Sequence, residues 1–91
     1  MKIEKSDRKD KRFVATFSDG TRTHFGLKNG STFIDGKRSI EERNNYLKRH
    51  AVRENFNDPK SAGALSAWLL WGGSTSLAKN HMDFMKHFNI S

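Results

Sequence analysis

The stretch DPKSAGALSAWLLW, residues 58–71, decides the fold because it predicts a helix that must be buried. Asp58 is a good helix cap, and Pro59 suits the first helical position, where a missing N–H loses no partner. Apolar side chains point in nearly every direction around this helix, about residues 59–71, and such a helix belongs in a core. Residues 72–73, both glycine, predict its end, one of them as a left-handed C-cap.

The residues before this helix predict a small antiparallel β-meander over about residues 12–35. Alternating apolar and polar side chains predict a half-buried strand at residues 12–17, and a return strand follows at 22–25. Asn29-Gly30 is a turn signal, and the sequence STFID at residues 31–35 predicts the third strand.

Two more helices are predicted, one on each side of the central helix. Ser39 and Glu42 form a capping box that opens a helix over about residues 39–53, and a last helix spans about residues 75–88. We expect their inner faces to be Ile40, Leu47 and Ala51 in the first, and Leu77, His81, Phe84, Met85 and Phe88 in the last. Strands followed by helices predict the α+β class, with the central helix buried.

The chain has 91 residues, enough for one domain with a modest core. We expect residues 12–91 to form a single α+β domain and residues 1–11 to form a charged N-terminal segment, with a short strand around Ile3. There is no cysteine, which excludes disulfides and thiolate chemistry. No stretch approaches the roughly 20 apolar residues of a membrane span, and the N-terminus lacks the apolar centre of a signal peptide.

The net charge of +7 is concentrated in two segments. Residues 1–12 carry six basic and three acidic side chains, and residues 37–53 carry six basic and two acidic ones, whereas the remaining segments are balanced. Such concentration is typical of a polyanion-binding face, although a solvated helix face is the alternative. The predicted binding residues are Lys37, Arg38, Arg43, Lys48, Arg49 and Arg53, with Lys5, Arg8, Lys9, Lys11 and Arg12 as an auxiliary arm.

Other chemistry is weakly indicated. His50 and Glu54 are four residues apart, but there is no HExxH pattern and no second ligand pair, so we expect no metal site. No Ser/His/Asp set stands out, and we expect neither catalytic residues nor a cofactor. Trp68 and Trp71 would suit base stacking, but on so apolar a helix core packing is the favoured interpretation.

A series of motifs runs through the second half of the chain: YLKRH at 46–50, FNDP at 56–59, AGALS at 62–66 and LLWG at 69–72, with THFG upstream at 23–26. In these motifs the chain resembles a family of small uncharacterised proteins encoded by large nucleocytoplasmic DNA viruses of algae and amoebae. The resemblance covers about residues 12–90, and its specific part is 46–72. It implies a viral origin and association with the virion, but no mechanism and no catalytic residue.

We therefore expect a small basic, non-catalytic viral protein that binds nucleic acid mainly through the phosphate backbone, in packaging or condensation of the genome. DNA is favoured over RNA as the partner, and no sequence feature specifies bases. The alternative is a structural virion component, such as a minor capsid or cement protein, that binds other proteins, and a host-interaction factor is a third hypothesis. The expected location is the virion or the interior of the host cell, with neither secretion nor membrane insertion.

Overall fold

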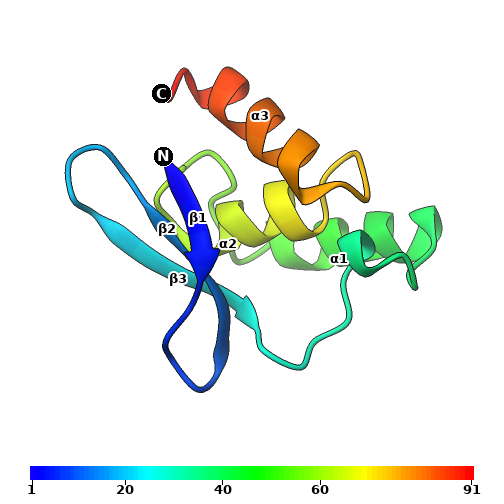
Figure 1. Cartoon of the computed structure of the whole chain (residues 1–91). Coiled ribbons are helices and arrows are strands. Elements are labelled where there is room, and N and C mark those ends of the chain that lie inside the picture. Colours follow the sequence, from blue (N-terminus) through cyan, green and yellow to red (C-terminus); the bar gives the residue numbers. More distant parts are fainter.

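A three-stranded antiparallel sheet with strand order β1-β2-β3 opens the chain (Figure 1). The computed structural model describes all residues 1–91 and places the strands at Lys2–Lys5 (β1), Lys11–Thr16 (β2) and Arg22–Leu27 (β3). The predicted hairpin of β2 and β3 is confirmed, and Phe13 lies opposite Phe25 in its register. Because side chains alternate between the faces of a strand, Ala15 and Phe25 are buried in the core.

The sheet extends into the charged N-terminal segment, because β1 is formed by the residues around Ile3. Ile3 lies opposite Ala15 on β2 and packs against the core. The strand expected here is confirmed, and it supplies the third strand of the sheet. Within residues 1–11, Met1 and the loop at residues 6–10 therefore lie outside the sheet, and the other residues belong to β1 or begin β2.

The strand predicted at residues 31–35 is wrong, since these residues lead into a short 3₁₀ helix, η1, at Phe33–Asp35. Thr32 is its N-cap, and the Asp35 carboxylate accepts hydrogen bonds from the Thr32 backbone N–H at 2.9 Å and from its hydroxyl at 3.0 Å. A threonine followed three residues later by an acid is a helix-start pattern, and it outweighs the strand propensity of Phe33 and Ile34. Phe33 still reaches the core, but from a turn and not from a sheet edge.

The central helix is buried as predicted, but it begins three residues later than expected. It consists of α2 at Ala62–Leu65 and a continuing π-helical turn, η2, at Ser66–Leu70. Ser61 is the cap, because its hydroxyl accepts from the Ala64 N–H at 3.1 Å. Asp58 instead accepts a hydrogen bond from the Lys60 N–H at 3.0 Å in a separate turn. The predicted helix start at Pro59 is therefore wrong.

The end of the central helix also differs from the prediction. Neither Gly72 nor Gly73 has a positive φ, so the predicted left-handed glycine cap is wrong. Gly72 is required for another reason: a Cβ at this position would collide with the Trp68 carbonyl oxygen and with the Asn80 side chain. The glycine therefore allows the last helix to approach the backbone of η2.

Two twelve-residue helices flank the central one, α1 at Ile40–Ala51 and α3 at Leu77–Phe88. The capping box of Ser39 and Glu42 is confirmed at the start of α1, and Ser76 caps α3. The inner stripe predicted for α3 is confirmed in outline, because Phe84 is fully buried and Leu77 and Phe88 pack against the core.

The inner stripe predicted for α1 is wrong. Ile40 is 67% exposed, and Ala51 is also exposed, so only Leu47 of that stripe reaches the core. The side of α1 that faces the protein carries Arg43, Tyr46 and His50, whose contacts are described below. A basic residue and two polar aromatics anchor this helix, and none of its residues is fully buried.

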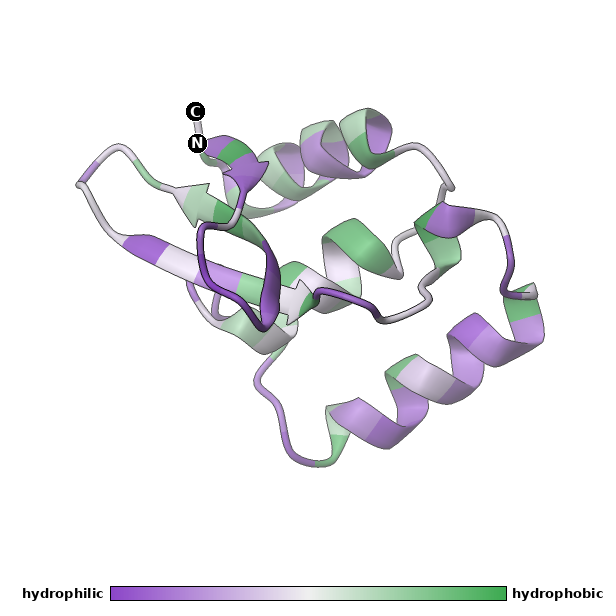
Figure 2. Ribbon diagram, turned by 60° about the horizontal axis from the view of Figure 1, so that its bottom comes forward, coloured by the Kyte–Doolittle hydropathy of each residue, from purple (hydrophilic) through white to green (hydrophobic).

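The central helix lies between the sheet, α1 and α3 (Figures 1 and 2). In Figure 2 its ribbon is largely green, whereas α1 is mostly purple. The core joins Leu65, Leu69 and Leu70 from this helix to Phe25 from the sheet and Phe84 from α3. No helix in the chain combines the length and apolar character needed to cross a bilayer. The α+β class and the order of a sheet followed by three helices are confirmed.

Candidate nucleic-acid interface

The outer face of α1 displays cations that have no acidic partner. Lys48, Arg49 and Arg53 are exposed, and none of the three lies within 4.0 Å of a carboxylate oxygen. Lys48 and Arg49 belong to α1, whereas Arg53 lies in the turn that follows it, because the helix ends at Ala51 and not at residue 53 as predicted. Their charge is therefore available to an anion in solution.

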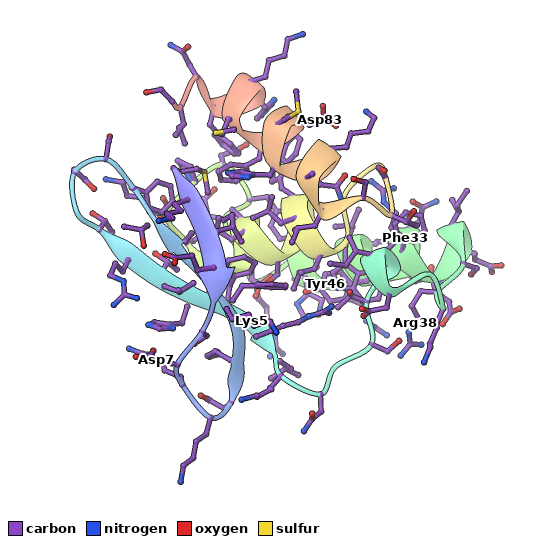
Figure 3. All side chains as sticks on the ribbon, in the orientation of Figure 1. Lys5, Asp7, Phe33, Arg38, Tyr46 and Asp83 are labelled. Carbon is purple, nitrogen blue, oxygen red and sulfur yellow. The ribbon has the colours of Figure 1, made fainter.

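Arg38 stands just before α1 and is partly neutralised. Its guanidinium lies 2.7 Å from the Glu42 carboxylate, which also accepts from the Ser39 N–H in the capping box. The hydrogen bond from Arg38 is the main reason why the pKa of Glu42 lies below its usual range. The exposed ion pair is weak in water, so Arg38 remains accessible to a phosphate. Figure 3 shows Arg38 at the outer edge of the molecule.

Arg43 has a different role from the other predicted binding residues. Its Nε donates to the backbone carbonyls of Trp71 at 3.0 Å and Gly72 at 2.7 Å, and one terminal nitrogen donates to Asn44. These carbonyls end the central helix and have few other partners. Arg43 thus fastens α1 to the core, and we do not count it among the phosphate ligands.

A column of stacked rings completes the attachment of α1. Tyr46 stacks on Trp71 with ring centroids 4.1 Å apart, and His50 stacks on the other face of Tyr46 at 4.1 Å. The His50 Nδ1 lies 3.3 Å from Glu54, and burial raises the pKa of the Tyr46 hydroxyl. The column fixes the rotation of α1 about its axis and so determines which side chains face outward.

The cations that precede α1 meet those of the sheet. An open polar hollow of about 410 Å³ is lined by Arg12 of β2, Lys28 after β3 and Lys37 before α1, together with Asp35. Arg12 is paired with Asp35 through two hydrogen bonds of 2.7 and 3.1 Å, whereas Lys28 and Lys37 have no acidic partner. The fold therefore brings together two basic segments that are 24 residues apart in sequence.

Sequence reasoning missed Lys28, which lies in a segment of balanced charge. Its position becomes informative only when the turn after β3 brings it beside Lys9, with which it lines a shallow surface depression. No local pattern in the sequence marks this contact, because it depends on the register of the strands.

The remaining residues of the predicted auxiliary arm are spread over the sheet and its first loop. Lys5 is exposed on β1 (Figure 3). Arg8 and Lys9 are exposed in the loop at residues 6–10, and Lys11 begins β2. The structure holds these cations on a folded hairpin. Arg12 lines the 410 Å³ hollow together with Lys28 and Lys37. Lys9 lines the separate depression beside Lys28, which Lys37 does not reach.

A smaller hollow of about 210 Å³ lies where α1 meets Trp71. Arg38, Glu42 and Arg49 line it together with Tyr46 and Trp71. Two guanidinium groups against one carboxylate leave an excess of positive charge, which suits a single phosphate. No group of three or more His, Asp or Glu side chains is arranged to hold a metal ion anywhere in the chain.

A family model described as Family of unknown function (DUF5754) matches residues 1–50, which is more than half of the chain. The matched part contains the sheet, η1 and nearly all of α1. Because the match covers more than half of the chain, the protein belongs to this family. No curated protein and no solved structure matches the chain.

Proposed function

We propose that this DUF5754 protein is a non-catalytic nucleic-acid-binding protein that contacts phosphates through α1 and the hollow beside it. The observation that carries the proposal is that Lys28 and Lys37 line the same hollow, and that Lys37 stands just before α1, whose Lys48 and Arg49 have no acidic partner. A charged patch built from separate segments is the footprint expected for a polyanion.

The dimensions of α1 fit this role. Its 12 residues span about 18 Å, which is roughly half a turn of duplex DNA. Without Arg43, five of the six predicted residues remain to contact phosphates: Lys37, Arg38, Lys48, Arg49 and Arg53. Each contact releases counterions, so binding to duplex DNA is expected to follow the salt concentration with a log–log slope of about −4.5.

The partner in this proposal is DNA in preference to RNA, because the sequence resembles proteins of large DNA viruses. In such a virus, backbone binding without base selection would serve packaging or condensation of the genome. A protein for this task needs a high capacity for phosphate and tolerates any sequence, which agrees with the lack of a base-reading motif.

The test is binding of the purified protein to a fluorescent random duplex over a salt series. For five contacts, the affinity is expected to fall roughly 500-fold between 50 and 200 mM salt. No binding at low salt would contradict the proposal and would favour the alternative of a structural virion component whose charge meets a protein partner.

Two charge-reversal variants distinguish the effect of charge at the α1 face from the effect of total net charge on duplex binding. Arg49→Glu/Arg53→Glu is expected to abolish measurable duplex binding. Lys79→Glu/Lys86→Glu, on the exposed side of α3, changes the net charge equally and is expected to weaken binding far less. Equal losses in the two variants would show that only total charge matters and would contradict the assignment of the face.

A further inference from the structure

An apolar hollow of about 360 Å³ lies between α1, η2 and α3. In Figure 2, α1 and α3 lie on opposite sides of the central helix, and residues of all three elements line the hollow. Its apolar lining comes from Leu47, Phe56 and Trp68, and its polar lining from Arg43, Asn57 and His87. No acidic side chain lines it.

Trp68 gives the hollow a rigid aromatic wall. Its ring is held by edge contacts with Phe84 at 6.4 Å and Phe88 at 5.7 Å, and it lies 4.4 Å from the His87 ring. Trp68 is only half-buried, unlike its neighbours Ala67 and Leu69. Core packing, which the sequence favoured for this residue, therefore accounts for only part of the indole surface.

The polar groups of the hollow are free to bind. The Asn57 side-chain amide and the His87 ring nitrogens make no hydrogen bond within the protein, and both residues are exposed. Arg43 adds positive charge while its guanidinium holds the carbonyls of Trp71 and Gly72. A ligand that fits must be flat, largely apolar on its faces, polar at its edge and electron-rich.

We propose that this hollow binds an unpaired nucleobase of a single strand whose phosphates lie on α1, an inference that rests on the proposed function. A base offers a π-face to Trp68 and Phe56, and base–aromatic stacking tolerates any sequence. The Asn57 carboxamide matches the N6 and N7 edge of adenine with one acceptor and one donor. An aliphatic side chain of a protein partner could not form a hydrogen bond with Asn57 or His87.

The location of the hollow agrees with this assignment. Leu47 faces the hollow, and Lys48, the next residue of α1, is one of the exposed cations. A strand that follows the cations of α1 would thus carry its bases past the opening. A duplex keeps its bases stacked inside and cannot use this site without extruding one, which costs a few kcal/mol.

The experiment compares an oligodeoxyadenylate strand with an abasic strand of the same length and the same number of phosphates. The strand with bases is expected to bind at least about fivefold more tightly, the low end for one stacked base, and to quench tryptophan fluorescence. Equal affinities would overturn the base site and leave phosphate binding intact, whereas no binding of either strand would overturn both proposals.

The variant of choice is Asn57→Asp, because replacing Trp68 would also disturb its packing against Phe84 and Phe88. Asn57→Asp removes the amide donor from an exposed loop and leaves the stacking rings in place, so it is expected to reduce the preference for adenine bases over the abasic strand. Lys79→Gln makes the same change of charge on the exposed side of α3, away from the hollow, and is expected to keep that preference. An undiminished preference in Asn57→Asp would overturn the assignment of Asn57 to the site.

Discussion

The helices α1 and α3 are matched in length and capping, yet they contribute differently to the protein. Each has 12 residues and a serine cap whose hydroxyl accepts from the third backbone N–H of the helix. α3 buries Phe84 and Asn80 completely, whereas α1 buries none of its residues. α3 is therefore part of the core, while α1 is mounted on it through Arg43 and the Tyr46 ring.

The difference shows how a small domain can place its burial in one helix and its exposed positive charge in another. Because α1 contributes little apolar burial, its outer side chains can be basic without disturbing the core. Because Arg43 and Tyr46 fix its orientation, those side chains still present a defined surface. The following variants test this division, beginning with the largest expected effect.

Truncation of the core residue of α3 is expected to have the largest effect. Phe84→Ala should lower the free energy of unfolding by about 3–5 kcal/mol, because the ring is fully buried beside Trp68. Ile40→Ala on the exposed side of α1 should change it by less than about 0.5 kcal/mol. Urea denaturation measures both, and similar losses would contradict the division between the two helices.

Two arginines of α1 give the sharpest matched pair. Arg43→Ala should cost about 1–3 kcal/mol of stability, since it leaves the carbonyls of Trp71 and Gly72 without their donor. Arg49→Ala should leave stability within about 0.5 kcal/mol and weaken binding to duplex DNA. Thermal unfolding and a binding titration on the same samples separate the two roles. If both variants lost the same stability and the same affinity, the two roles would be refuted.

Removal of either helix cap should cost a similar free energy, but the exchange of different backbone amides should increase in the two variants. Ser39→Ala and Ser76→Ala each remove a cap worth about 1 kcal/mol. In α3 the loss should reduce the hydrogen-exchange protection of the core amides. In α1 it should increase exchange only within that helix, because α1 can open locally. Reduced protection of the core amides in Ser39→Ala would show that α1 unfolds only with the whole domain.

The smallest expected effect concerns the ion pair that connects β2 to η1. The hydrogen bonds from Arg12 lower the pKa of the Asp35 carboxyl to about 2. A carboxyl whose pKa is lower in the folded state adds stability above its unfolded pKa of about 4, and this stability is lost as the pH falls toward 2. Because the pair is partly exposed, the contribution should not exceed about 1 kcal/mol. Asp35→Asn should flatten this part of the stability curve, and an unchanged acid limb would exclude Asp35 as its source.

The sequence predicts α3 well and α1 poorly for the same physical reason. In α3 the inward residues include Leu77, Phe84 and Phe88, whose hydropathy marks them as a stripe. In α1 only Leu47 is an inward apolar residue, and the other inward residues are Arg43 and Tyr46, which bury an apolar body and keep a polar tip. On a helical wheel these look like surface residues, so Ile40 and Ala51 are assigned to the inside by mistake.

Local signals that compete with each other account for the other errors. Asp58 and Ser61 are both good caps, and only the backbone geometry decides that the helix begins after Ser61. Thr32 and Asp35 carry a capping signal within a segment that also has strand propensity. The cationic face of α1 follows from the sequence, whereas the hollow at Lys28 and the one at Trp68 require the tertiary fold to bring distant residues together.

The central claim, that α1 displays the phosphate-binding face and α3 does not, is tested most directly by mapping contacts in solution. The ¹⁵N-labelled protein would be titrated with a short blunt duplex, and the shifts of its backbone amides followed. We predict that the amide resonances of α1, of residues 37–38 and of Lys28 shift on titration, while the amide resonances of α3 do not change. Shifts concentrated on α3, with α1 unaffected, would contradict the account.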